Sequence, residues 1–159
     1  MDMQAEAASY LVSVRPLLYR PGEKRNVEVA IDAETAAGFG MRFTQLPVVK
    51  GVLENRAGVL FFRYTAEGVA DLECDRCLAS VAMHMNESFE HIVVTETATE
   101  QNDSDYLLTE NAMLDIAETV MTDLRLALPS KILCSEDCLG ICPCCGANRN
   151  QHSCNCQQA

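Results

Sequence analysis

The chain has 159 residues, enough for one ordinary domain with a hydrophobic core and a small appended module. Hydrophobic residues make up 48% of it, which excludes a compositionally disordered chain, and no apolar run reaches the roughly 18 residues that a membrane helix needs. The formal net charge of −11 argues against broad, non-specific binding to nucleic acid. The first residues lack the basic and apolar regions of a secretory signal, so we expect a cytoplasmic protein that does not enter membranes.

The charge is distributed unevenly along the chain. Residues 1–76 carry nine of the twelve Lys and Arg and eleven of the twenty-three Asp and Glu, a balance of −2, whereas residues 77–159 have a balance of −9. Any direct contact with RNA therefore has to be local. The best local candidates near the start of the chain are Arg15, Arg20, Lys24 and Arg25. The simpler interpretation of these four residues is a solvated charged edge beside a turn.

The first half of the chain predicts strands. Residues 10–14 and 27–32 are short apolar or alternating runs, separated by a turn that contains Pro21 and Gly22. Residues 46–54 and 59–64 carry β-branched and aromatic side chains on either side of Gly58, which favours a hairpin. Residues 69–73 and 79–95 predict two further strands. We expect a mainly antiparallel meander.

A polar, acidic stretch at about 96–111 predicts a flexible loop. Beyond it, Met113, Ile116, Val120 and Leu124 recur at helical spacing, and Pro129 ends the pattern, which predicts one amphipathic helix over about 112–127 that packs on the sheet. The expected fold is therefore α+β, with a strand-rich core domain over 1–130. Residues 131–159 have too few apolar side chains to stay ordered without a cross-link, and they form a separate cysteine-rich tail.

Cysteine dominates the tail. The chain has nine cysteines, seven of them in its last 26 residues. Without an export signal, such crowding indicates metal ligands rather than a disulfide framework. Cys74 and Cys77 form one C-x-x-C pair and Cys142 and Cys145 another, a spacing that lets a tight turn direct both sulfurs to one ion. Gly146 permits the chain to turn back after the second pair.

Counting ligands suggests one or two zinc ions. Cys144 lies inside the second C-x-x-C pair and does not fit its spacing, so we set it aside. Eight thiolates remain, enough for two tetrahedral sites. We favour one site with the two C-x-x-C pairs, and a second site with the other four cysteines. A single site confined to the tail is a second interpretation, and His152 is a less favoured substitute ligand. The eight candidate ligands are Cys74, Cys77, Cys134, Cys138, Cys142, Cys145, Cys154 and Cys156.

The same residues resemble a known family. The run from Leu72 to Leu78, the helix that ends at Pro129, and the tail from Cys134 to Asn148 are similar to the YceD family, the large ribosomal RNA subunit accumulation proteins. The resemblance implies a part in the accumulation or processing of large-subunit ribosomal RNA, with that RNA or a pre-ribosomal protein as partner and no small-molecule substrate. In the family, the position of Cys144 usually holds another residue.

We therefore expect a zinc-stabilised, non-catalytic ribosome-biogenesis factor. The alternative is a zinc-ribbon protein–protein interaction module unrelated to RNA. Four-cysteine sites are closed, which disfavours metal-dependent hydrolysis, and a C-x-x-C between strands lacks the helix N-terminus expected of a redox dithiol. Arg76, inside the first pair, is a possible RNA or partner contact, but we favour a role in balancing thiolate charge or in pairing with an acidic neighbour such as Asp75.

Overall fold

The computed structural model describes residues 10–95 and 106–156. Its elements follow the chain as β1 (Leu11–Ser13), α1 (Arg15–Leu18), β2 (Lys24–Ala30), α2 (Ala33–Gly38), β3 (Phe43–Arg56), β4 (Val59–Glu73), β5 (Ser80–Thr95), β6 (Tyr106–Thr109), β7 (Met113–Asp115) and α3 (Ile116–Ala127). No helix of this part of the chain is both long enough and apolar enough to cross a membrane.

In the described residues, the main sheet has the order β2-β3-β4-β5-β6. Strands β2 to β5 form an antiparallel meander, and β6 pairs in parallel with β5. The strand predicted at residues 10–14 forms, but it pairs with β7 in a separate two-stranded sheet. The prediction of an α+β fold with a mostly antiparallel sheet is confirmed.

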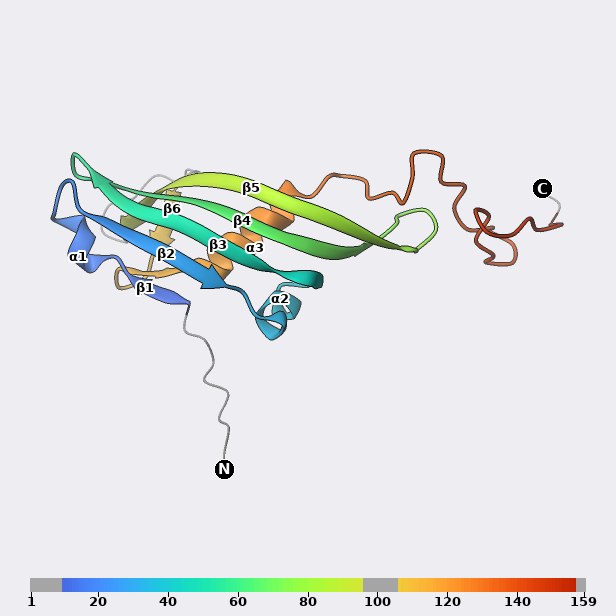
Figure 1. Ribbon diagram of the computed structural model, residues 1–159, viewed down its shortest axis with the longest axis horizontal. Coiled ribbons are helices and arrows are strands. Elements are labelled where there is room, and N and C mark those ends of the chain that lie inside the picture. Colours follow the sequence, from blue (N-terminus) through green and yellow to red (C-terminus); the bar gives the residue numbers. More distant parts are fainter. Residues whose placement is uncertain (1–9, 96–105, 157–159) are drawn as a thin grey trace, which may run out of the picture.

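Strand β4 is continuous where two shorter strands were predicted. Its buried positions alternate from Leu60 through Tyr64 to Ala70, the period of a strand with one face on a core. Gly68 lies where β3 bulges toward β4, and a Cβ there would lie 3.0 Å from the carbonyl oxygen of Gln45. The glycine therefore allows β3 and β4 to approach each other closely, and it does not interrupt β4. As a result, β4 and β5 form one long hairpin (Figure 1).

Helix α3 covers one face of the sheet (Figure 1). Ile116, Val120 and Leu124 are buried in the same core cluster as Leu53 and Phe62 of the sheet. The helix begins four residues later than the predicted start at 112, because Asp115 caps it by accepting a hydrogen bond from the Glu118 backbone N–H at 3.0 Å. The three residues before the helix belong to β7 instead.

The loop predicted at 96–111 is partly wrong. Residues 96–105 lie outside the described part of the chain, but Tyr106–Thr109 forms β6. This strand is only four residues long, and it forms by pairing with Ile92–Thr95. A contact with a distant part of the chain, rather than a local sequence pattern, therefore determines it.

After α3 the chain runs past the far end of the β4–β5 hairpin and turns back on itself without a further helix or strand up to residue 156 (Figure 1). The turns of this tail are pinned by the isolated bridge between Ile141 and Asn148. Helix α1 and the start of β2 lie at the opposite end of the sheet. The cysteine-rich tail and the N-terminal cations are therefore at opposite ends of the long axis.

Candidate metal centres

The first C-x-x-C pair lies in the turn that joins β4 to β5, at the tip of the long hairpin. The Cys74 backbone N–H donates to the Ala79 carbonyl oxygen at 2.8 Å, and the Leu78 N–H donates to the Cys74 carbonyl oxygen at 2.9 Å. Leu78 adopts a left-handed conformation with φ 62°. These bonds fold the six residues into a knuckle in which both sulfurs lie on one side.

The second C-x-x-C pair repeats this backbone pattern in the tail. The Cys142 N–H donates to the Ala147 carbonyl oxygen at 2.8 Å, and the Gly146 N–H donates to the Cys142 carbonyl oxygen at 2.9 Å. Gly146 has φ 72°, in the region that glycine adopts without strain, as the sequence predicted for the turn back. The two knuckles are therefore built in the same way, although one joins two strands and the other lies in an irregular tail.

The first knuckle joins Cys134 and Cys138 to form a quartet of sulfurs. The Sγ atoms of Cys74 and Cys138 lie 3.8 Å apart, and those of Cys77 and Cys134 lie 3.6 Å apart. All four sulfurs lie within 4.8 Å of one another, and three of the four residues are buried. This first quartet connects the hairpin tip to the start of the tail.

Asp75 and Arg76 hold the tail against the hairpin tip. The Asp75 N–H donates to the Ile132 carbonyl oxygen, and the Ile132 N–H donates to Asp75 Oδ2, both at 2.8 Å. Arg76 Nη1 donates to the Cys138 carbonyl oxygen at 3.1 Å, and the Arg76 carbonyl oxygen accepts from the Ile141 N–H at 3.1 Å. The Cβ of any residue replacing Gly140 would lie 3.1 Å from that carbonyl oxygen, so glycine permits this close approach.

Arg76 makes structural contacts that the sequence did not predict. Pairing with an acidic neighbour such as Asp75 was one of the two favoured interpretations, beside balancing of the thiolate charge. Instead, Arg76 binds main-chain oxygens of the tail, while Asp71 and Glu73 face Arg42 at 3.9 and 3.7 Å.

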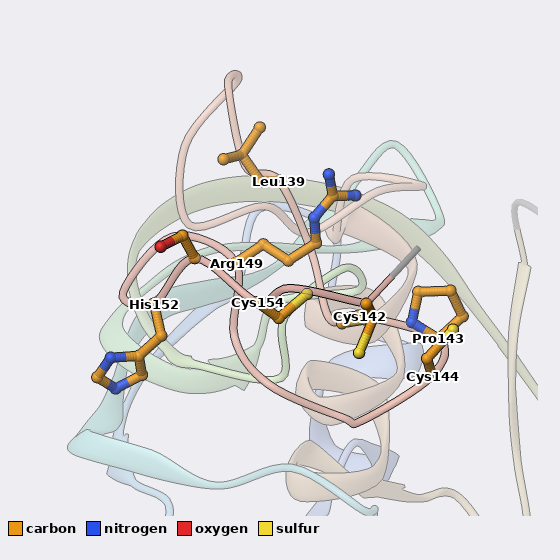
Figure 2. A pocket seen from close by; sticks show the side chains of 9 residues that line it. Leu139, Cys142, Pro143, Cys144, Arg149, His152 and Cys154 are labelled. Carbon is orange, nitrogen blue, oxygen red and sulfur yellow. The ribbon is translucent and has the colours of Figure 1, made fainter. Parts of the chain in front are cut away.

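The second knuckle joins Cys154 and Cys156 to form a second quartet, with all four sulfurs within 4.8 Å of one another. A groove runs beside it, lined by Leu139, Pro143, Arg149, His152 and the neighbouring cysteines. Figure 2 shows His152 and the Pro143 ring at opposite ends of this groove, with Cys142 and Cys154 between them. His152 and Cys144 belong to neither quartet.

Hydrogen bonds within each quartet set the pKa values of its thiols. Burial opposes ionisation of Cys74, but backbone N–H groups, led by that of Cys134, point at its sulfur and lower its pKa to about 6. Backbone N–H groups of Cys145 and Cys144 likewise lower the pKa of Cys142 to about 6. Hydrogen bonding to its quartet neighbours raises the pKa of the Cys134 thiol to about 12. Each quartet thus favours a thiolate at its knuckle, the form that binds metal.

Both quartets fit a tetrahedral zinc ion. Zinc–thiolate bonds of about 2.3 Å place neighbouring sulfurs roughly 3.8 Å apart in a tetrahedron, close to the two separations in the first quartet. All nine cysteines are free, so no disulfide competes for these sulfurs. Four soft thiolates in a compact group suit zinc rather than magnesium or calcium.

The structure corrects the favoured partition of the cysteines. The two C-x-x-C pairs do not share a site; Cys134 and Cys138 complete the first, and Cys154 and Cys156 complete the second. Asp75 fixes the segment that contains Cys134 beside the hairpin tip, and the short connection from Cys145 to Cys154 closes the second quartet locally.

Residues 62–159, more than half of the chain, match the family described as large ribosomal RNA subunit accumulation protein YceD. The chain belongs to the YceD family. It matches no curated protein and no solved structure.

The YceD match covers the β4–β5 hairpin, helix α3 and both cysteine quartets, and it leaves out the four N-terminal cations. Arg15, Arg20 and Arg25 are exposed, and Arg25 Nη1 donates to the Ser13 carbonyl oxygen at 3.3 Å. Lys24 lies 2.9 Å from Glu54. The structure therefore does not bring these residues together with Arg76, which lies at the hairpin tip.

Sequence reasoning missed Asn150, which contacts the first quartet of this YceD protein from the end of the tail. Its Nδ2 donates to the Cys138 sulfur at 3.3 Å, and its Oδ1 accepts from the Leu139 N–H at 2.8 Å. Asn150 also contacts Asn148, the bridge partner of Ile141. An asparagine in a polar tail gives no local signal of such a role.

Proposed function

We propose that this protein is a zinc-stabilised, non-catalytic ribosome-biogenesis factor that supports accumulation or processing of large-subunit ribosomal RNA. The observation that carries this proposal is the YceD family match, which spans the hairpin tip and both cysteine quartets. Nine free thiols suit a reducing compartment, so we place the activity in the cytoplasm.

Zinc in each quartet would supply a closed cross-link. The first quartet would fasten the tail to the hairpin tip, and the second would fold the end of the tail on itself. The donor chemistry supports this assignment, because four thiolates per site leave no position for a substrate or an attacking water. In residues 10–95 and 106–156, these are the two groups of three or more side chains that could hold a metal ion.

The test is depletion of the gene in its host, with measurement of mature large- and small-subunit ribosomal RNA. We expect a selective loss of large-subunit RNA that is restored by the wild-type gene and by Cys144→Ser, but not by Cys74→Ser. Unchanged ribosomal RNA after complete depletion would contradict the proposed function. Protein levels of each variant, measured by immunoblot, separate loss of function from degradation.

Exposed leucines at the tip favour a protein-interaction module as a second candidate. Leu78 and Leu139 are 62% and 59% exposed, and Leu78 is in a left-handed conformation that an L-residue adopts only at a cost. In this case, partners captured with the purified protein would remain after nuclease treatment, and Leu78→Ser would release them. Partners released by nuclease alone would instead favour an RNA-mediated association.

A further inference from the structure

A group of cations lies on the open face of the sheet, at the end farthest from the cysteines. This face is turned away from the core: Lys24, Glu54 and Phe61 occupy one cross-strand row, and Arg63 pairs with Val52 in the next row of the same face. The side chains of Lys24, Arg56 and Arg63 are 60%, 44% and 40% exposed. We call Lys24, Glu54, Arg56 and Arg63 the Glu54 cluster.

Glu54 receives three cations on one carboxylate. Lys24 Nζ lies 2.9 Å from Oε1, and Arg56 Nε and Arg63 Nη2 lie 2.8 and 2.9 Å from Oε2. These contacts, led by the Lys24 hydrogen bond, hold the pKa of Glu54 below its usual value, so the carboxylate stays charged and fixes the cations in place. One carboxylate does not neutralise three cations, and the nearby Glu90, 3.5 Å from Arg63, leaves a positive balance.

Arg63 has hydrogen-bonding capacity to spare. Its Nε is shielded from solvent and has no hydrogen-bond partner, since Glu90 is too far away for a good bond. A shallow hollow beside it is lined by Arg63 itself, Lys50, Thr65, Glu90 and other residues of β3 to β5. An anion in this hollow would lie beside the Arg63 guanidinium and Lys50, whose charges attract phosphate oxygens.

An aromatic ring adjoins the cations. The Arg56 guanidinium lies 5.4 Å from the centroid of the half-buried Phe61 ring, on the same face of the sheet. Tyr19, 85% exposed, caps the C-terminus of α1. Helix α1 lies at the same end of the molecule as the start of β2 (Figure 1). Surfaces that bind single-stranded nucleic acid usually combine two components. Cations contact the phosphate backbone, and aromatic rings beside them stack on the bases.

Other cations lie toward the same end of the sheet. Six of the twelve Lys and Arg residues of the chain are found there: Arg15, Arg20, Lys24, Arg25, Arg56 and Arg63. Cations gathered in this way attract a polyanion locally.

We propose that the Glu54 cluster and the hollow beside it bind the phosphate backbone of single-stranded RNA, with Phe61 stacking on a base. This inference rests on the proposed function and names ribosomal RNA itself, rather than a ribosomal protein, as the partner at this face. Glu54 is a positioning residue, and Lys24, Arg56 and Arg63 bind the phosphates.

The test uses the full-length protein and a fluorescein-labelled 12-nucleotide oligouridine, with fluorescence anisotropy between 50 and 200 mM salt. We expect the double variant Arg56→Gln, Arg63→Gln to weaken binding about tenfold or more, because neither glutamine can form the charge-assisted hydrogen bonds of an arginine. The slope of log affinity against log salt should become shallower by about 0.7 for each phosphate that the variant no longer neutralises. Arg42→Gln with Lys131→Gln removes the same charge from outside the Glu54 cluster and is the matched control.

Two further variants keep the test decisive. Arg56→Lys with Arg63→Lys preserves the charge around Glu54, so it should fold even if the glutamine pair unfolds, and it should lose less affinity than that pair. Phe61→Leu should weaken binding without changing the salt slope. Equal weakening by the control pair would mean that only total charge matters, and no binding by the wild type would indicate a protein partner; either result would overturn the proposal.

Failure of this RNA-binding surface is distinguishable from failure of the proposed function. A glutamine pair that loses oligouridine binding yet restores large-subunit ribosomal RNA in depleted cells would contradict this inference and leave the biogenesis role intact. Depletion without effect on ribosomal RNA would contradict the biogenesis role, whatever the binding result.

Discussion

Leu78 and Gly146 occupy equivalent positions, the residue after the second cysteine of each knuckle, and both are left-handed. A left-handed conformation costs an ordinary residue roughly 1–2 kcal/mol, and glycine avoids this cost. Gly146 is therefore the residue that the turn favours, whereas Leu78 is strained and also exposed. A strained side chain that contributes little to packing suits a role in contact with a partner, which is why Leu78 is the residue to change in the pull-down experiment.

Two cysteine variants test the two quartets at the residue scale. Cys138→Ser removes one ligand from the first quartet, so we expect elemental analysis to find about one zinc per chain instead of two. Cys144→Ser should leave the zinc content unchanged, because Cys144 belongs to neither quartet. Zinc lost from Cys144→Ser, or retained in full by Cys138→Ser, would contradict the assignment of ligands.

The sequence was sufficient to select the eight cysteines that form the two quartets but not to group them. Spacing alone predicted both knuckles and the surplus of Cys144, since a C-x-x-C turn is a local structure. The grouping depends on the Asp75–Ile132 contacts, which join residues 57 positions apart and have no local signature. The Glu54 cluster was missed for the same reason: Arg56 and Arg63 meet Lys24 only through the register of three strands.

At the scale of elements, Asp123 fastens helix α3 to the sheet. Its carboxylate accepts a hydrogen bond from the Tyr64 hydroxyl of β4 and lies 2.5 Å from Nε2 of His91 on β5. Tyr64 is buried and stacks on Phe62, with ring centroids 4.8 Å apart. One helix residue thus joins two neighbouring strands, a contact that helical periodicity could not reveal although it predicted the packed face correctly.

Tyr64→Phe should lower the free energy of unfolding by about 1 kcal/mol at neutral pH, because it removes one buried hydrogen bond. Burial, followed by the Asp123 carboxylate, raises the pKa of Tyr64 well above its usual value of 10.0. A raised folded-state pKa stabilises the protein below pH 10 and loses that contribution as the pH rises further. The difference between wild type and variant in urea denaturation should therefore shrink above pH 10, and a constant difference would contradict this assignment.

At the scale of the whole molecule, the protein is electrically polar. Residues 77–159, which contain seven of the nine cysteines besides Cys77, have a charge balance of −9, against −2 for residues 1–76. A zinc ion bound by four thiolates would add two further negative charges per site. Six of the twelve Lys and Arg residues lie toward the α1 end. RNA bound to the Glu54 cluster would leave the cysteine end, with Leu78 and Leu139, free for a protein contact.

Metal removal should affect hydrogen exchange at the cysteine end of the molecule and leave the rest protected. After chelation under reducing conditions, we expect faster hydrogen exchange at residues 131–156 and in the Cys74–Ala79 turn, because both depend on the first quartet. Protection in β2 to β4 and in α3 should persist, since their shared core contains no cysteine ligand. Uniform loss of protection would mean that the metal sites support the core, and an unchanged turn would mean that the hairpin folds alone.

The first quartet also has a consequence for translation. A ribosome synthesises Cys74 and Cys77 long before Cys134 and Cys138, which follow 57 or more residues later. Until then, the nascent hairpin holds two of the four sulfurs of the first quartet, so a zinc ion could not be fully enclosed. A chain that ended before Cys134 would keep this site open, so its closure by a metal would require a nearly complete chain.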